Sequence, residues 1–394
     1  MRNLGFVLYI LAAVGTVTST IFLGLVFLAV SRFRRGLPRK MQAISEVPQG
    51  ALPFVSVMKP VHGMEPRLKE TLRSFFQQDY PKYEIIFGAR NADDPAVAVV
   101  EELRQEFPAI PVSLVYSGPP QSPNAKVYSL DKMMTAAKSD YVIISDSDVF
   151  VQPEYLRNVT APLLDPKTGL VTCVYRGVPV GGSWALLEGL GMSVDMTSGV
   201  LLADMFEGMK FALGPTMATR KDALAKIGGI KVTANFYSDD FELGRMIAEA
   251  GYHVELSPHI IEHMVVDTDF VPSLDHQLRW MKSTRFSRPL GHLGSGLTFA
   301  VPFGILGSIG GILMGAPAAG ALLLACSMLN RILQCVTMGW SVVRDKRAIT
   351  LCWLYPARDL FGFLLWVLSF TGGRFDWRGE KYQFQRGGRI VSYR

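Results

Sequence analysis

Two aspartates that follow a short apolar run are the residues best suited to chemistry in this chain. The run Tyr141–Ile144 reads Tyr-Val-Ile-Ile, which is typical of a strand buried on both faces, and Asp146 and Asp148 come directly after it. Open α/β sheets place their ligands at this carboxyl end of a strand. An Asp-x-Asp loop there offers hard oxygens to a divalent cation that also binds a diphosphate. The alternative is an ordinary solvent-exposed turn, which Asp and Ser also favour.

A second acidic pair, Asp93 and Asp94, follows another expected strand and directly precedes Pro95. Carboxylates in such a loop can accept hydrogen bonds from a base or a ribose. Because Pro95 opens an expected helix, capping of that helix is an equally good interpretation of the pair. Either residue can serve both purposes.

Lys126 and Asp240 are two further polar residues at the ends of expected elements. Lys126 stands near the start of the helix that leads to the central strand, and a lysine in this place can face a phosphate. Asp239 and Asp240 begin a later helix. The helix dipole favours carboxylates at this end, so capping accounts for Asp239 and leaves Asp240 as an additional acid available for chemistry.

A basic and aromatic pair, Arg279 and Trp280, lies farther along the chain. A guanidinium held against an indole can be fixed in place for a phosphate. The three basic residues that follow, Lys282, Arg285 and Arg288, are typical of a helix that lies against lipid headgroups.

Alternating strand and helix signals surround these residues from position 53 onward. Strands are expected at 54–59, 83–89, 112–116 and 141–144, with a helical pattern between each pair of neighbours. This βαβαβαβ order predicts a largely parallel, doubly wound sheet whose strand-end loops form a nucleotide site. The chain has neither a Gly-x-Gly-x-x-Gly motif nor a Walker loop, which argues against a dinucleotide dehydrogenase and against a P-loop NTPase.

The overall composition indicates a membrane protein. Of the 394 residues, 49% are hydrophobic and 19% are charged, and the net charge is +6. This positive balance fits contact with anionic lipid or an anionic substrate, while nucleic acid is a poorer fit because no basic stripe carries interleaved aromatic residues. The four cysteines form no CxxC pair, so neither a zinc site nor a disulfide framework is indicated, and a cytosol-facing active domain follows.

The first segment, residues 4–31, is almost uncharged and is followed by Arg32, Arg34 and Arg35. It is long enough to cross a bilayer, which takes about 20 apolar residues. Because the positive charges follow the apolar run, we expect a retained anchor with the next part of the chain in the cytoplasm. A buried core helix is the alternative.

Three more apolar segments, 297–316, 318–343 and 348–371, lie near the end of the chain. If all of them cross together with the first segment, the basic tail lies outside, against the positive-inside tendency. Arg358 and Asp359 sit inside the last segment, where unpaired charges are costly. That segment is therefore re-entrant, or it pairs these charges with neighbouring helices.

The order of these features resembles the ceramide glucosyltransferase family, glycosyltransferase family 21, which includes bacterial enzymes that glycosylate hopanoid lipids. The resemblance rests on the acidic pair at 93–94, on Asp-Ser-Asp at 146–148, on Ser-Asp-Asp at 238–240 and on the Arg-Trp pair. The stretch 75–84, Phe-Phe-Gln-Gln-Asp-Tyr-Pro-Lys-Tyr-Glu, is also similar to that family.

The resemblance implies a division into an anchor with its basic flank at 1–40, a Rossmann-like, mostly parallel GT-A domain at 50–290, transmembrane helices at 295–372 and a basic tail at 373–394. It implies that Asp146 and Asp148 hold Mg²⁺ or Mn²⁺ with the sugar diphosphate and that Asp240 is the general base. Nucleotide-sugar binding is implied for Asp93, Asp94, Lys126, Asp146, Asp148, Arg279 and Trp280. Asn91 and His276 depart from the family's usual residues at their positions.

The implied function is a metal-dependent, inverting transfer of glucose or N-acetylglucosamine from a UDP-sugar to a lipid hydroxyl, with ceramide or a hopanoid as acceptor. We expect an integral protein of the cell inner membrane whose active domain faces the cytoplasm. A processive polysaccharide synthase has the same acids and the same Arg-Trp pair, and is therefore one alternative. A membrane protein that binds a nucleotide sugar without turnover is another.

Overall fold

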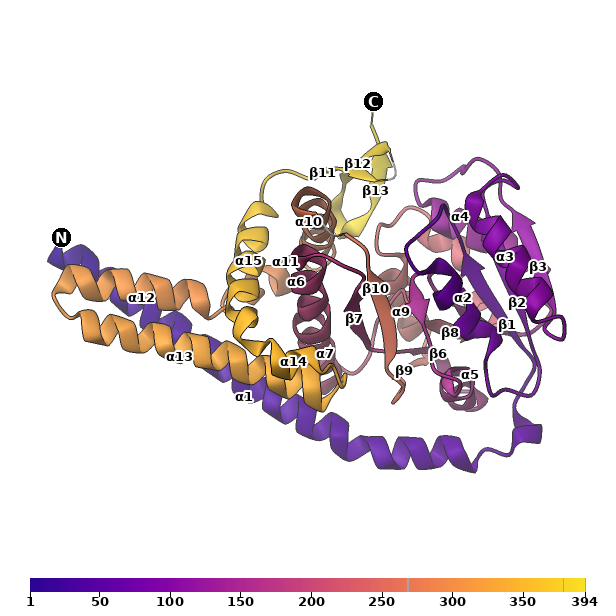
Figure 1. Cartoon of the computed structure of the whole chain (residues 1–394), viewed down its shortest axis with the longest axis horizontal. Coiled ribbons are helices and arrows are strands. Elements are labelled where there is room, and N and C mark those ends of the chain that lie inside the picture. The colour runs from indigo at the N-terminus through magenta and orange to yellow at the C-terminus, as the bar shows by residue number, and fades with distance from the viewer. Residues whose placement is uncertain (268, 378, 394) are drawn as a thin grey trace. The chain divides into compact units, whose positions relative to one another are not determined.

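The computed structural model describes residues 1–267, 269–377 and 379–393, and the chain divides into two compact units (Figure 1). The helical unit consists of Met1–Arg35, Gly181–Met205 and Asp267–Gly388. The sheet unit consists of Gly36–Val180, Phe206–Val266 and Arg389–Arg394. Both units are discontinuous in the sequence, so two parts of the expected 50–290 domain, 181–205 and 267–290, belong to the helical unit.

A seven-stranded sheet in the order β3-β2-β1-β4-β8-β6-β9 forms the centre of the sheet unit. Its strands are β1 (Val55–Pro60), β2 (Tyr83–Ala89), β3 (Val112–Tyr116), β4 (Tyr141–Ile144), β6 (Thr168–Thr172), β8 (Met217–Arg220) and β9 (His253–Leu256). All pairings are parallel except those of β8 with β4 and with β6. The expected mostly parallel α/β sheet is thereby confirmed, with β4 at its middle.

Helices between the strands cover this sheet and supply its apolar core. They are α2 (Leu68–Phe76), α3 (Pro95–Glu106), α4 (Ala125–Ala136), α5 (Tyr155–Thr160), α8 (Lys221–Lys226) and α9 (Asp239–Glu249). Strand β2 is buried along its whole length, as expected for a strand covered on both faces. Gly88 lies so close to α4 that an added Cβ atom would stand 2.3 Å from the sulfur of Met133. Any other residue here would require the Met133 and Ser129 side chains to move.

Beyond the end of β4, the chain enters a smaller three-stranded sheet of the same unit. It is ordered β5 (Val149–Phe150), β10 (Ile261–Val265) and β7 (Tyr175–Pro179). The pairing of His263 with Val149 and the hydrogen bond from Met264 N to Asp148 O (2.9 Å) fix the loop that holds Asp146 and Asp148.

The helical unit contains the first 35 residues of the long helix α1 (Arg2–Glu46) and a central group of helices. That group comprises α6 (Ser183–Gly191), the π-helix η3 (Met192–Met196), α7 (Thr197–Glu207), α10 (Phe270–Ser287), α11 (Pro289–Ser295), α12 (Val301–Met314), α13 (Pro317–Cys335), the π-helix η5 (Val336–Trp340), α14 (Arg347–Thr350) and α15 (Tyr355–Leu368). The antiparallel strands β11 (Arg374–Trp377) and β12 (Glu380–Phe384) follow them.

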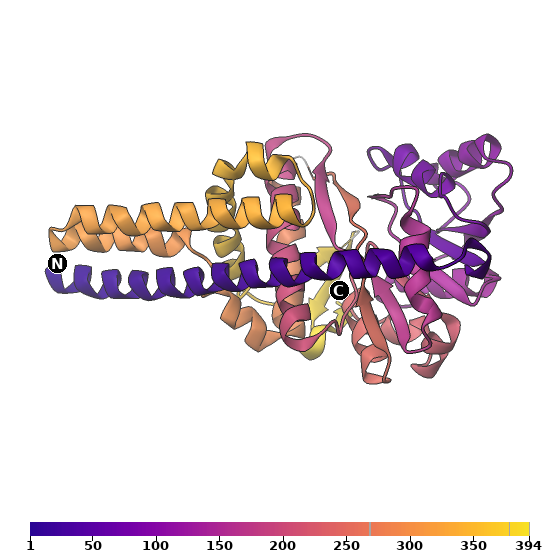
Figure 2. The ribbon, with the colours of Figure 1, turned by 90° about the horizontal axis from the view of Figure 1, so that it is seen from below.

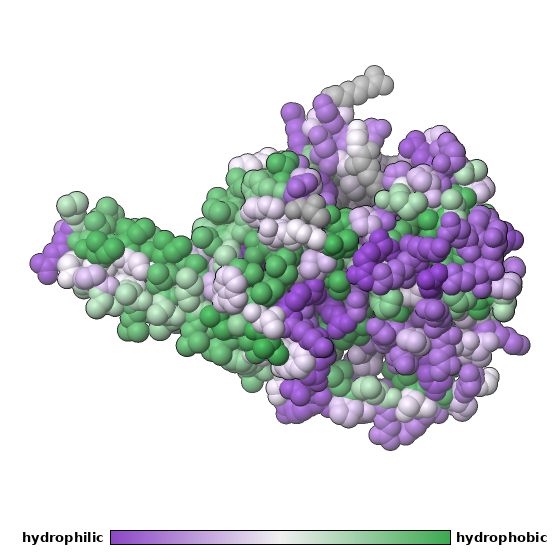
Figure 3. Space-filling model, viewed as in Figure 1, coloured by the Kyte–Doolittle hydropathy of each residue, from purple (hydrophilic) through white to green (hydrophobic). Residues whose placement is uncertain are grey.

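Helices α12 and α13 form a hairpin along which the first half of α1 runs (Figures 1 and 2). Small residues allow the close approach, since a Cβ atom on Gly310 would stand 2.8 Å from the carbonyl oxygen of Gly5. Apolar side chains gather over these three helices on the face shown in Figure 3. Exposed examples on them are Val14, Ile309 and Leu322.

Three helices among the described residues are long and apolar enough to cross a membrane: Arg2–Glu46, Ser183–Glu207 and Pro317–Trp340. The first and the third correspond to apolar segments expected from the sequence, so the prediction of apolar helices near both ends of the chain is confirmed. Ser183–Glu207 differs from the other two because 67% of its most apolar window is buried, compared with 28% and 33%. It is a core helix of its unit by this measure.

The last expected apolar segment, 348–371, is broken into α14, a short 3₁₀ turn and the 14-residue helix α15. At about 1.5 Å per residue, α15 falls short of the ~30 Å hydrocarbon layer of a bilayer. Its two charges are both paired within the helical unit. Asp359 accepts hydrogen bonds from Ala300 N and Val301 N and lies 3.3 Å from Arg331, while Arg358 donates to Gln277 Oε1 (2.7 Å).

Candidate active site

The loop after β4 places Asp146 and Asp148 at the carboxyl end of the sheet's middle strand. Because Met58 of β1 pairs with Ile144, the next residue of β1, Lys59, lies beside this loop. Lys59 Nζ donates to the main-chain oxygen of Asp146 and to Ser145 Oγ (3.3 Å), and it stands 3.7 Å from the centre of the Phe75 ring. Burial lowers the pKa of Lys59 to about 7, against the opposing effect of Asp146 and Asp148.

Lys126, at the start of α4, forms an ion pair with Asp146. Its Nζ lies 2.6 Å from Asp146 Oδ1 and 3.9 Å from Asp239 Oδ2. Asn124 holds this helix end in place, since its Oδ1 accepts from Val127 N and its Nδ2 donates to Asp239 Oδ1. Burial alone lowers the pKa of Lys126, but the charges of Asp146 and Asp239 outweigh it, so the net shift is upward and the amine stays charged.

Asp240 faces the same space as Asp146. A Cβ atom on Gly214 would lie 3.2 Å from Asp240 Oδ2 and 3.4 Å from Asp146 Oδ2. Two backbone amides hold the Asp240 carboxylate, with Gly214 N at 2.6 Å and Phe241 N at 2.8 Å. Burial, and then the charge of Asp239, raise the pKa of Asp240 to about 6. Such a carboxylate is ionised at neutral pH and is more basic than an exposed one.

Asp148 offers the strongest sign of a cation-binding site. Its Oδ1 is buried and has no hydrogen-bond partner among the described residues, and its Oδ2 lies 3.7 Å from His263 Nε2. A buried carboxylate oxygen without a partner is costly unless an ion or water binds it. Carboxylate and imidazole groups such as those of Asp148 and His263 are ligand types that suit a divalent metal ion.

Asp93 and Asp94 take different places in the loop after β2. Asp94 caps α3 by accepting from Ala96 N (3.0 Å), and it also accepts from Gly63 N (2.9 Å). The Oδ2 atom of Asp94 lies 3.1 Å from Nδ1 of the His62 ring. Asp93 is exposed in the turn. The capping interpretation of the sequence therefore applies to Asp94.

Arg279 and Trp280 lie on α10, in the helical unit. The Trp280 ring packs against His276, with the ring centres 4.3 Å apart. Arg279 Nε is buried and lacks a hydrogen-bond partner among the described residues. The sheet unit thus brings together Asp146, Asp148, Asp240 and Lys126, while the Arg-Trp pair belongs to the other unit.

Sequence reasoning did not identify Lys59 or His263 as site residues. A visible signal existed for each, because both are ionisable residues inside apolar strands, Val-Ser-Val-Met-Lys-Pro and Ile-Glu-His-Met-Val. Such a residue is costly to bury unless it has a partner. The partner itself depends on strand order, which the sequence alone does not give.

Comparison with known proteins adds a family to this geometry. The profile described as Glycosyl transferase family 21 matches residues 7–390. Ceramide glucosyltransferase 3 of Caenorhabditis elegans is 27% identical over 233 residues, which cover 59% of this chain and 50% of that protein. A ceramide glucosyltransferase of Komagataella phaffii is 35% identical over 101 residues, or 25% of this chain and 20% of that protein. The chain spans about half the length of the two curated relatives from C. elegans.

A solved structure with a similar fold is that of mannosyltransferase PcManGT from Pyrobaculum calidifontis, in complex with GDP-Man and Mn²⁺. It has a TM-score of 0.52 and 19% identity, covering 90% of this chain and 99% of that chain. This likeness supports the expected GT-A type of fold. Because the family profile covers nearly the whole chain, the resemblance expected from the sequence is confirmed, and this chain belongs to glycosyl transferase family 21.

Proposed function

We propose that this chain is a hexosyltransferase that moves glucose or N-acetylglucosamine from a UDP-sugar to a hydroxyl group of a membrane lipid, ceramide or a hopanoid. The observation that carries the proposal is the meeting of Asp146 and Asp240 around Gly214, beside Lys126, in a member of this family. The relatives named as ceramide glucosyltransferases support a lipid acceptor. The long apolar helices support a site that works at a membrane.

Asp146 and Asp148 are proposed to hold Mg²⁺ or Mn²⁺. When bound, such a cation offsets the negative charge that develops on the departing nucleoside diphosphate, an effect worth several kcal/mol. The mannosyltransferase of similar fold was solved with Mn²⁺ and GDP-Man, which is consistent with this assignment. Lys126 adds a fixed positive charge beside the same phosphates.

Asp240 is proposed as the general base. A lipid hydroxyl is a weak nucleophile, and a positioned base that takes its proton accelerates such attack by ~10²–10⁴-fold. The amides of Gly214 and Phe241 hold the carboxylate in one orientation, so its remaining lone pairs are available to the acceptor. Attack from the side of this base, opposite the departing diphosphate, inverts the anomeric carbon.

The remaining residues expected from the sequence are proposed to position the nucleotide sugar. Exposed Asp93 is suited to the base or ribose, and Asp94 supports it through the cap of α3. Arg279 and Trp280 are proposed to act on the diphosphate and on the acceptor side. The basic residues at 32, 34 and 35, after the apolar part of α1, support a location in the cell inner membrane with the sheet unit in the cytoplasm.

The test uses the purified chain in detergent with a panel of UDP-sugars. Ceramide, diacylglycerol and a hopanoid polyol serve as acceptors, and mass spectrometry identifies the lipid products. A singly glycosylated lipid is the expected result. A polymeric product identifies a processive synthase instead, and nucleotide-sugar binding without any product identifies a binding protein.

Asp240→Asn is expected to lower the initial rate ~100-fold or more, because the base is lost while its shape is kept. The matched control is Asp140→Asn, which changes an exposed aspartate just before the opposite end of β4. The control is expected to retain the wild-type rate. Full activity of Asp240→Asn removes this residue as the base.

A further inference from the structure

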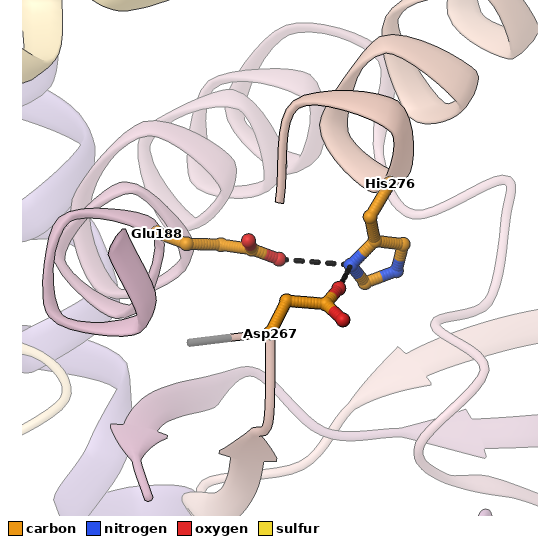
Figure 4. Close-up of side chains that lie close together, drawn as sticks. All are labelled: Glu188, Asp267 and His276. Carbon is orange, nitrogen blue, oxygen red and sulfur yellow. Dashed lines mark hydrogen bonds and ion pairs between the residues drawn. The ribbon is translucent and has the colours of Figure 1, made fainter. Parts of the chain in front are cut away.

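Three side chains of the helical unit meet outside the proposed active site. They are Glu188 of α6, Asp267, which lies shortly after β10, and His276 of α10 (Figure 4). His276 Nδ1 lies 2.9 Å from Glu188 Oε1 and 3.1 Å from Asp267 Oδ2. One ligand atom from each of the three residues falls within 4.8 Å of the other two.

We propose that Glu188, Asp267 and His276 form a second divalent-metal site, specific for a transition metal such as Zn²⁺ and structural in role. This inference goes beyond the proposed function, because the cation that serves the sugar diphosphate is assigned to the sheet unit. Nothing in the transfer reaction requires it. It stands or falls independently of the substrate.

The spacing of the ligand atoms fits coordination by one ion. Metal bonds to imidazole nitrogen and carboxylate oxygen are about 2.0–2.2 Å long, so neighbouring ligands of one ion stand roughly 3–3.5 Å apart, depending on the geometry. The two measured separations from His276 Nδ1 are close to this range. A single Nδ1 carries at most one hydrogen and therefore cannot make a full hydrogen bond to both carboxylates.

The ligand types favour a transition metal over Mg²⁺ or Ca²⁺. Imidazole suits Zn²⁺, Fe²⁺ and Ni²⁺, whereas all-oxygen sites suit the harder cations. Two carboxylates with a neutral imidazole carry two negative charges, which one divalent ion balances. Glu188 is almost wholly buried, so its charge needs a compensating positive charge, which either a protonated His276 or a bound metal ion supplies.

Neighbouring groups already hold the Glu188 ligand in place. Its second oxygen, Oε2, accepts hydrogen bonds from Ser273 Oγ (2.6 Å) and Gln277 Nε2 (3.3 Å). Arg358 Nη1 in turn donates to Gln277 Oε1. Outer partners of this kind orient the ligands of protein metal sites and leave the other oxygen, here Oε1, for the ion.

The site is open on one side. The side chains of Asp267 and His276 are 28% and 25% exposed, so water can complete the coordination shell and an ion can enter. Because its ligands come from two helices and from the segment that precedes α10, the ion would join three separate parts of the helical unit. We expect metal binding to raise the thermal stability of the protein.

The experiment uses the full chain in detergent, stripped with a chelator and then equilibrated with Zn²⁺. The double variant Asp146→Asn with Asp148→Asn removes the proposed donor-sugar site, and mass spectrometry of the metal content reports what remains. We expect one zinc per chain to remain, together with a higher Tm than in the stripped protein. Adding Glu188→Gln or His276→Gln to this background is expected to abolish both the bound zinc and the rise in Tm.

His276→Lys distinguishes metal binding from a proton held between the carboxylates. A lysine ammonium keeps a positive charge at this position but is not a metal ligand while protonated, so this variant is expected to fold and to bind no zinc. Co²⁺ gives a second readout, since its visible absorption bands report an imidazole ligand and should vanish in the same variant. Less than half an equivalent of zinc in the double variant, or zinc retained after His276→Gln, overturns the proposal.

Discussion

Asp240 combines two features that a catalytic base needs, a fixed orientation and a raised pKa. Burial and the charge of Asp239 raise the pKa of Asp240 to about 6. Because only the ionised carboxylate accepts a proton, kcat/KM is expected to fall about tenfold per pH unit below this value and to be level above it. A pH–rate profile between pH 5 and 8 with the lipid acceptor measures this.

A flat profile through pH 6 would contradict the role of Asp240 as base. The control is nucleotide-sugar binding, measured across the same pH range. It separates a loss of the catalytic base from a loss of donor binding. Asp240→Glu keeps the charge and shifts its position, so it is expected to retain the shape of the profile at a lower rate.

Lys59 is a buried amine that donates to two acceptors of the Asp146 loop, the Asp146 main-chain oxygen and Ser145 Oγ. In Lys59→Met, a side chain of similar volume still packs on the Phe75 ring, but the hydrogen-bond donor is lost. A hydrogen bond from a charged group contributes about 1.5–3 kcal/mol, so a misplaced loop is expected to lower kcat/KM roughly 10- to 100-fold.

Lys59→Met is expected to lower activity without lowering stability. Replacing a buried charge by an apolar side chain of similar volume is often neutral or stabilising. We therefore expect an unchanged or higher Tm in thermal unfolding beside the lower kcat/KM. A large drop in Tm would mean that Lys59 supports the fold rather than the loop.

At the scale of elements, the acidic pair after β2 separates into a structural and a binding residue. Asp94 caps α3 and also holds Gly63 N, whereas Asp93 is exposed. Asp94→Ala is expected to lower the free energy of unfolding by about 1 kcal/mol, in the range of 0.5–2 kcal/mol for a lost cap. Thermal unfolding in detergent checks this.

Asp93→Ala is the matched comparison one residue away. It is expected to leave Tm unchanged and to raise KM for the UDP-sugar. Equal losses of stability in the two variants would count against the division of roles, as would an unchanged KM in Asp93→Ala.

The elements that could be predicted from the sequence are those whose signal is local. Strand β4 and the two aspartates after it follow from a β-branched run that ends in turn residues, and α1 follows from its long uncharged stretch. The sequence does not mark Ser183–Glu207 as a core helix, because burial by other helices, not composition, makes it part of the core. Pairing of the charges in the last apolar segment could be expected from their cost in a membrane, but their partners, such as Arg331 for Asp359, lie far apart in the chain and depend on helix packing.

The same limit applies to the candidate site. Asp146, Asp148 and Asp240 were recognisable because acids at strand and helix ends carry chemistry in many sheets. Lys59 and His263 act through neighbours that only strand order defines. Glu188 lies in an apolar helix, and its meeting with His276 depends on helix packing.

At the scale of the whole molecule, the chain passes between its two units five times. Segments 1–35, 181–205 and 267–388 form one unit and the intervening stretches form the other, so neither unit can be excised as one continuous piece. Substitutions therefore test membrane contact better than truncation does.

The exposed apolar surface of α1 and α12 is expected to face lipid. Val14 and Ile309 are 54% and 46% exposed, which is unfavourable in water for two helices this apolar. At the centre of a helix long enough to span a bilayer, such as α1, an arginine costs about 2.5–3.5 kcal/mol on insertion scales, and on the shorter helix α12 it is unfavourable wherever that surface meets lipid. Val14→Arg with Ile309→Arg is therefore expected to reduce the fraction of the protein that resists alkaline extraction from membranes. Met41→Arg is the control, because Met41 is also exposed on α1 (59%) but lies beyond its apolar part and within the sheet unit. Equal extraction of the double variant and the wild type would show that this surface does not contact lipid.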